Sequence, residues 1–170
     1  MTQAGTERLV STPDKAEILE EAVGLFNHSY LQIRLGKVLD SETYTACAEL
    51  SLDTSELDFE KLEVKLRRDE VKPDISLYPK RGLSRPRDIL RMKEMPLLVV
   101  EILSPRQGTD EILEKFQVYF ALGIRSCWLV DPALETIAVY ASMTDRTIFS
   151  TGDIVDDDLK ICASLSDIFV

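Results

Sequence analysis

Four side chains near the middle of the sequence have the types and spacing needed for chemistry on a phosphate ester. Asp74 follows Pro73 within one apolar segment, and Glu101 comes near the end of the next long one. Lys115 lies fourteen residues after Glu101, and Tyr119 follows it by one helical turn. Carboxylates can bind a metal ion that activates water, and an ammonium group stabilises developing negative charge. This order of residues is typical of a site for phosphodiester hydrolysis.

Asp74 and Glu101 are expected to bind one divalent cation together. Two carboxylates on neighbouring strands can converge on a hard cation, and magnesium prefers oxygen ligands while it keeps several of its waters. A backbone carbonyl often completes such a site at the end of a strand, and Ile102 is placed to offer one. The predicted cofactor is therefore Mg²⁺, with Mn²⁺ as a substitute, and Lys115 would polarise the attacking water.

Each of these residues also has a purely structural explanation. A Pro-Asp dipeptide often only marks a turn, and Glu101 could pair with an arginine. Lys115 stands four residues after Glu111, which is the spacing of a surface ion pair. It could also extend from an apolar helix face with its ammonium group in water. The combination, in this order along the chain, favours a site.

The apolar pattern predicts the strands and helices that must position these residues. Strands are expected at 43–52, 59–66, 71–78, 97–103, 126–130, 136–141, 146–150 and 159–163. Thr12-Pro13-Asp14 is a typical helix start, and a helical pattern continues to Leu39, with a bend near Ser29 or Gly36. A second helix is expected at 109–122, a helical turn around 89–92 and a closing turn at 165–169.

Single residues refine these expectations. Pro73 indicates that the strand at 71–78 lies at an edge, starts there or contains a bulge. The continuous apolar run at 97–103 indicates a strand that is buried on both faces. The only histidine, His28, lies in a helical segment, where a lone histidine is more often structural than a ligand. The acids at 153 and 156–158 are interpreted as a solvated turn.

Composition is that of an ordinary globular protein. The chain has 170 residues, 45% of them hydrophobic, which suits one domain over residues 12–170 after a loose N-terminal arm at 1–11. No apolar run is long enough for a membrane span and no signal peptide is recognisable, so a cytoplasmic location is expected. The three cysteines are far apart, which indicates small buried thiols rather than disulfides or a zinc site.

Charge is unevenly distributed along the chain. The net charge is −10, which alone argues against tight non-specific binding to nucleic acid. The segment 65–93, however, contains ten Lys or Arg and only four Asp or Glu. It could be a strip that faces phosphates, or a solvated loop with counter-ions.

Three stretches, taken with this pattern, resemble a known family. They are VKPDISLY at 71–78, PLLVVEILSP at 96–105 and DEILEKFQVYFALGIRSCWLVDP at 110–132, and the ending SLSDIF at 164–169 is also similar. A Pro-Asp, then a glutamate at a strand end, then a lysine is the pattern of PD-(D/E)xK nucleases. Within that superfamily the chain resembles the Uma2 group of restriction-endonuclease-like proteins, over roughly residues 14–170.

The resemblance implies an α/β fold of the restriction-endonuclease type, with a central mixed β-sheet flanked by helices, and often a dimer. The superfamily expects lysine two residues after the glutamate, where this chain has Leu103. In the Uma2 group the lysine is thought to have moved to the following helix, where it corresponds to Lys115. Asp110 would then orient the helix start or the substrate, and Tyr119 would support the lysine.

The leading prediction is therefore a metal-dependent DNA endonuclease, with Asp74, Glu101 and Lys115 as catalytic residues and a homodimer as the possible assembly. A binding or interaction module without catalysis on the same fold is the alternative, because fold does not dictate function and the protein is acidic. A plain α/β domain whose motif is a coincidence is the third reading.

Overall fold

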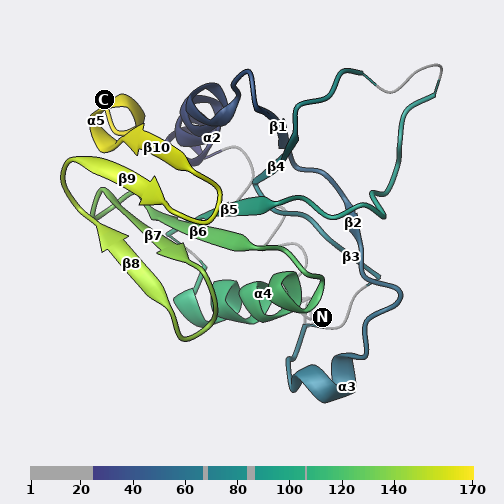
Figure 1. Cartoon of the computed structure of the whole chain (residues 1–170). Helices are drawn as coiled ribbons and strands as arrows, with labels where there is room; N and C mark the ends of the chain where they lie inside the picture. Colours follow the sequence, from purple (N-terminus) through teal and green to yellow (C-terminus); the bar gives the residue numbers. More distant parts are fainter. Residues whose placement is uncertain (1–24, 67–68, 84–86, 106) are drawn as a thin grey trace, which may run out of the picture.

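A six-stranded mixed sheet forms the centre of the protein. The computed structural model describes residues 25–66, 69–83, 87–105 and 107–170. In spatial order the strands of the sheet are β1 (Tyr44–Ala48), β4 (Ile75–Pro79), β5 (Leu98–Ile102), β6 (Ser126–Asp131), β7 (Thr136–Tyr140) and β8 (Arg146–Phe149). Only β5 and β6 are parallel to each other, and the helix α4 (Thr109–Ala121) connects them (Figure 1). The predicted mixed α/β architecture is confirmed.

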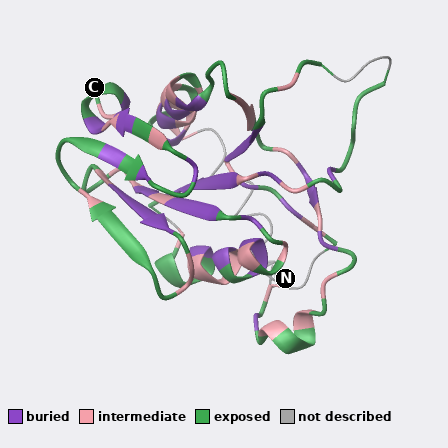
Figure 2. Ribbon diagram, viewed as in Figure 1, coloured by how far each residue is buried: buried purple, intermediate pink, exposed green. Residues whose placement is uncertain are grey.

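Different elements cover the two faces of this sheet. One face packs against α2 (Phe26–Leu39), the short α5 (Leu165–Ile168), β9 (Asp153–Asp156) and β10 (Ile161–Ser164). The other face packs against α4 and against the short antiparallel pair of β2 (Leu52–Asp53) and β3 (Glu70–Val71). Both faces of β5 and β6 are therefore buried, as Figure 2 shows, whereas the edge strand β8 is mostly exposed.

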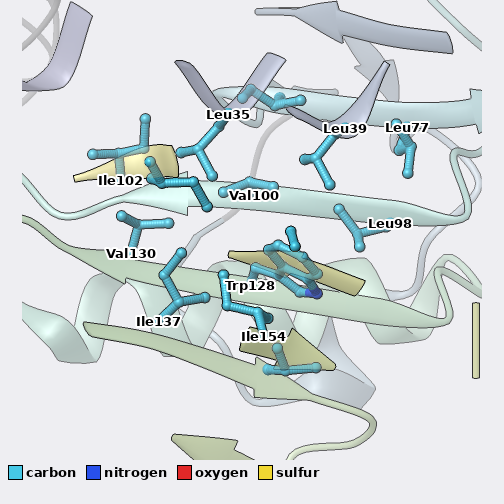
Figure 3. Packing of buried hydrophobic residues seen from close by; sticks show 14 of the residues in the cluster. Leu35, Leu39, Leu77, Leu98, Val100, Ile102, Trp128, Val130, Ile137 and Ile154 are labelled. Carbon is cyan, nitrogen blue, oxygen red and sulfur yellow. The ribbon is translucent and has the colours of Figure 1, made fainter. Parts of the chain in front are cut away.

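The pleat of β5 decides which side chain faces which layer. Leu98, Val100 and Ile102 point to the α2 face, where Figure 3 shows Leu35 of α2 in the same apolar cluster. Val99 belongs to the cluster on the α4 face. Because side chains alternate along a strand, Glu101 also faces α4.

The first predicted helix lies partly outside the described residues, which include neither the arm at 1–11 nor the start at Thr12. The described part, α2, is continuous from Phe26 to Leu39, so the expected bend near Ser29 or Gly36 does not occur. Its buried positions are His28, Leu31, Leu35 and Leu39, which recur at helical spacing. None of the helices in the described part of the chain is long and apolar enough to cross a membrane.

The strand predicted at 59–66 is wrong, because residues Phe59–Leu62 form the short helix α3. Asp58 precedes this helix and pairs with Lys61 at 3.0 Å, a spacing of three residues that suits a helical turn. Glu63 then takes a left-handed conformation with φ 53° and ends the helix. Apolar and charged residues alternate in this segment, which suggested a strand. In the structure the apolar residues are simply on the partly buried side of a short segment.

Two further predictions need correction. The helical turn expected at 89–92 does not form, and Met92 instead pairs with Leu52 in an isolated β-bridge. The acids near 156 are not all solvated, because Asp156 ends β9 and is only 3% exposed. Its carboxylate accepts hydrogen bonds from Ser126 at 2.5 Å and Trp128 at 3.0 Å, so it holds β9 against β6.

The long strand expected at 71–78 is interrupted where Pro73 stands. β3 ends at Val71 and β4 begins at Ile75, so the proline precedes a strand start and β4 itself is an inner strand. Of the three cysteines, only Cys127 is buried; Cys47 is half-buried and Cys162 is exposed, so the prediction of three buried thiols is wrong for two of them.

Candidate active site

Asp74 lies at the break between β3 and β4. Ile75 pairs with Val100 across the antiparallel strands, which places Asp74 opposite Glu101. The Oδ2 atom of Asp74 accepts a hydrogen bond of 2.6 Å from the backbone N–H of Ile102, at the end of β5. The aspartate is thus held beside the end of β5 by the backbone itself, and its side chain remains 17% exposed.

Glu101 is buried among polar partners that come from α4. Lys115 donates a hydrogen bond of 2.8 Å to Oε2 of Glu101, and the hydroxyl of Tyr119 donates one of 2.5 Å to Oε1. Lys115 and Tyr119 are four residues apart on α4, so both point from one side of the helix towards β5. Glu101 is only 1% exposed, while the Lys115 side chain keeps 20% of its surface accessible.

Burial and a neighbouring negative charge control the ionisation of this cluster. Burial raises the pKa of Glu101, the Lys115 ammonium opposes that rise, and the carboxylate of Asp74 adds to it. Burial and then Glu101 raise the pKa of Tyr119 well above its ordinary value, so the phenol stays protonated and donates a hydrogen bond to the glutamate. Because these two carboxylates repel each other, additional positive charge beside them is electrostatically favourable.

His28 belongs to the same site, although its sequence position did not reveal this. Its Nε2 atom lies 3.0 Å from Oδ1 of Asp74, and the residue is 7% exposed. The hydrogen bond to Asp74 is the main reason that the pKa of His28 is raised, although burial opposes the shift. The one available signal was that His28 shares the buried face of its helix with Leu31 and Leu35, where a polar residue needs a partner.

Gln32 and Glu49 surround the backbone of Asp74. Gln32, one turn after His28 on α2, donates hydrogen bonds to the carbonyl of Asp74 at 2.9 Å and to the carboxylate of Glu49 at 3.3 Å. The N–H of Glu49 also donates to the Asp74 carbonyl at 3.2 Å. Glu49 has φ 53°, an unfavourable backbone for a residue other than glycine, so the surrounding contacts must maintain this conformation.

The structure thus brings together Asp74, Glu101, Ile102, Lys115 and Tyr119. Asp110 does not join them, because it lies exposed in the first turn of α4. Within the described ranges, no group of three or more His, Cys, Asp or Glu side chains is arranged to hold a metal ion. The donor set is two carboxylates and a strand end, which fits magnesium because Mg²⁺ often takes only one or two carboxylates and completes its shell with water.

Comparison with known proteins identifies a family and a similar fold. A sequence profile of the Uma2 family, described as "Putative restriction endonuclease", matches residues 14–159. Among solved structures, the chain is similar to a protein from Anabaena variabilis ATCC 29413 described as "a putative nuclease belonging to DUF820". The TM-score is 0.64 at 21% sequence identity, over 84% of this chain and 80% of that one. None of the curated proteins matches the chain.

The fold and the family therefore define a protein of the nuclease-like class with a central mixed sheet. Because the family match spans most of its length, the chain belongs to the Uma2 family. The resemblance drawn from its sequence motifs is confirmed.

Proposed function

We propose that this protein is a metal-dependent endonuclease that hydrolyses phosphodiester bonds in DNA. The observation that supports this most is that Asp74, Glu101 and Lys115 come together at the end of β5. The Lys115 ammonium lies 2.8 Å from the Glu101 carboxylate, and Asp74 is bonded to the backbone of the next residue, Ile102. Membership of a family described as restriction endonucleases supports the choice of DNA as substrate.

Asp74 and Glu101, with the carbonyl of Ile102, would hold Mg²⁺, and Mn²⁺ would substitute for it. When bound, the cation would stabilise negative charge on the phosphate and lower the pKa of a water molecule. Asp74 is prepared for this role because the Ile102 N–H and His28 fix both of its oxygens. The Tyr119 hydroxyl similarly orients Glu101.

Lys115 has two tasks in this proposal. In the structure it neutralises Glu101, which would otherwise be an unpaired charge in the interior. When DNA is present, its partly exposed ammonium group would position the attacking water and stabilise the charge that develops on the phosphate. Asp110, in the exposed first turn of α4, would contact or orient the substrate rather than the reacting atoms.

The decisive experiment is cleavage of supercoiled and linear DNA with Mg²⁺ or Mn²⁺ by the wild type and by Lys115→Met. We expect the variant to lose a factor of about 10² to 10³ in rate, because one preorganised charge is removed from the transition state. Asp74→Asn is the second variant, since it keeps the size of the side chain and an oxygen that can accept from Ile102.

Lys61→Ala is the matched control, because Lys61 is also a helical lysine paired with an acid, but it lies on α3 with its side chain 83% exposed. This variant should cleave like the wild type. If cleavage persists in both Lys115→Met and Asp74→Asn, the assignment is wrong. If the folded wild type binds DNA without cutting it, the non-catalytic module becomes the better description.

A further inference from the structure

The connection between β4 and β5 concentrates positive charge in an acidic protein. Residues 80–94 include six Lys or Arg and two acids, although the whole chain has a net charge of −10. Figure 1 shows the described parts of this connection reaching outwards from the sheet, and Figure 2 shows that most of their residues are exposed. We refer to the described residues 80–83 and 87–94 as the basic loop.

Contacts at its base hold the basic loop in place. The Arg81 guanidinium binds the Glu94 carboxylate at 2.7 and 3.0 Å and lies 4.4 Å from the centre of the Tyr78 ring. The Tyr78 hydroxyl donates a hydrogen bond of 3.0 Å to the carbonyl of Glu94. On the other side, the carbonyl of Met92 accepts a hydrogen bond of 2.8 Å from the backbone N–H of Asp53 in β2. A loop held at its base loses less conformational entropy when it binds a partner.

Large apolar side chains lie exposed among these cations. Leu83 is 83% exposed, Leu90 is 92% exposed and Ile89 is 47% exposed. Arg87 and Arg91 lie on either side of Ile89 and Leu90 in the sequence and are exposed as well. A single exposed leucine is ordinary, but three such residues between cations on an outlying loop form a chemically mixed surface. Nucleic acid suits it, because cations contact phosphates while apolar side chains contact sugars or enter between base steps.

The basic loop also contacts β3, the strand that precedes Asp74 in the sequence. The Nε atom of Arg91 lies 3.5 Å from the Glu70 carboxylate in β3, and the Arg91 side chain also donates to the carbonyl of Asp69. Glu70 precedes Asp74 by four residues, through the break that positions the aspartate. A duplex bound to the loop would therefore lie beside the strand that leads to the site.

We propose that the basic loop is the surface through which this protein holds duplex DNA, with Arg87, Arg91 and Lys93 on phosphates and Leu90 against sugars or bases. This inference rests on the proposed function, because it assumes that DNA is the substrate. It assigns DNA binding to a part of the chain that none of the candidate catalytic residues occupies.

The test is the affinity of the full chain for a fluorescent duplex, measured by anisotropy over a range of salt concentrations in EDTA, so that no cleavage occurs. In the triple variant Arg87→Gln/Arg91→Gln/Lys93→Gln, the slope of log K against log salt should become shallower by about 2.7, since each lost phosphate contact changes it by about 0.9. The affinity at low salt should fall at least tenfold. Leu90→Ser should weaken binding by about threefold or more without changing the slope, because it removes an apolar contact only.

The matched control is Lys37→Gln/Arg146→Gln/Lys160→Gln, which removes the same charge from exposed positions on α2, β8 and the β9–β10 connection. It should bind DNA like the wild type. Equal weakening in both triple variants would mean that only net charge matters and would overturn the proposal. Failure of the wild-type protein to bind DNA would overturn the proposal as well.

A third result concerns the partner. The basic loop of one copy could instead contact the acidic surface of another, and sedimentation of the same variants reports this. If the loop variant loses a dimer that the control retains while DNA affinity is unchanged, the loop is a subunit contact and the proposal is overturned. Because binding is measured without metal, loop-dependent binding in a protein that never cuts would refute the proposed function and leave this inference standing.

Discussion

Glu101 is the residue on which the candidate site depends most. A buried carboxylate is costly to ionise, and here Lys115 and Tyr119 satisfy its two oxygens from a single helix. Asp74, only one strand away, makes that ionisation harder and so favours a further cation. The catalytic proposal thus depends on the balance of charge around one side chain, with which Lys115 forms an ion pair.

His28 should make the stability of the protein depend on pH. Its pKa is raised from the ordinary value of 6.5 mainly by the hydrogen bond to Asp74. A histidine with a raised pKa contributes stability that is fully present below pH 6.5 and is lost as the pH rises through the pKa of the folded protein. Since it is the only histidine in the chain, no other imidazole contributes.

We therefore expect the difference in free energy of unfolding between the wild type and His28→Gln to be largest in acid and to shrink above pH 6.5. Urea unfolding in EDTA, from about pH 5.5 to about pH 8.5, measures this difference. Parallel profiles for the two proteins would show that the contact between His28 and Asp74 does not exist in solution.

At the scale of elements, α4 delivers the lysine and β5 delivers the glutamate. Ile112, Phe116 and Tyr119 on α4 are fully buried, so the apolar face that anchors the helix also sets the direction of Lys115. The rings of Phe116 and Tyr140 in β7 form a T-shaped pair with 5.2 Å between their centroids. The helix ends where Gly123 takes φ 86°, and the chain then turns into β6.

Two glycines should respond in opposite ways to substitution by alanine. Gly36 lies inside α2 with no atom near the place of an added Cβ, so Gly36→Ala should stabilise the protein by about 0.5–1 kcal/mol. Gly123 also has space, but its positive φ disfavours a side chain, so Gly123→Ala should destabilise the protein by about 1 kcal/mol. Thermal unfolding of both variants measures the contrast; stabilisation by Gly123→Ala would contradict the end of α4 described here.

At the scale of the whole molecule, metal binding should appear as increased stability. A ligand that binds only the folded state at a hundred times its dissociation constant adds about 2.7 kcal/mol to the free energy of unfolding. We expect Mg²⁺ or Mn²⁺ to raise the melting temperature of the wild type. Asp74→Asn should show no response, because the cation loses one of its two carboxylates.

Asp110→Asn is the matched control for this measurement. Asp110 is an exposed acid on α4, outside the carboxylate cluster, so its variant should respond to the metal like the wild type. A response that is equal in the Asp74 and Asp110 variants would place the cation elsewhere and would remove the metal from the proposed site.

The sequence by itself determined the strands of the central sheet and the helix α4, and it predicted the candidate acids and lysine that the structure brings together. Buried strands such as β5 are continuous apolar runs, and α4 has acids at its start and a glycine at its end, so local patterns were sufficient. The motif residues also carried the family resemblance that comparison confirmed. The segment at 59–66 was misread because a short helix with few buried residues has no clear period.

Only the tertiary structure decided which residues meet. His28 and Asp74 are far apart in the chain, and nothing local indicates that a buried face of α2 will lie on the start of β4. The burial of Asp156 and the position of the basic loop beside β3 arise in the same way. For His28 and Asp156 the physical reason is that a buried polar group needs a partner, and the partner comes from a distant segment. Arg91 of the basic loop is exposed, but its partner Glu70 also comes from another element, which only the packing of the chain brings near.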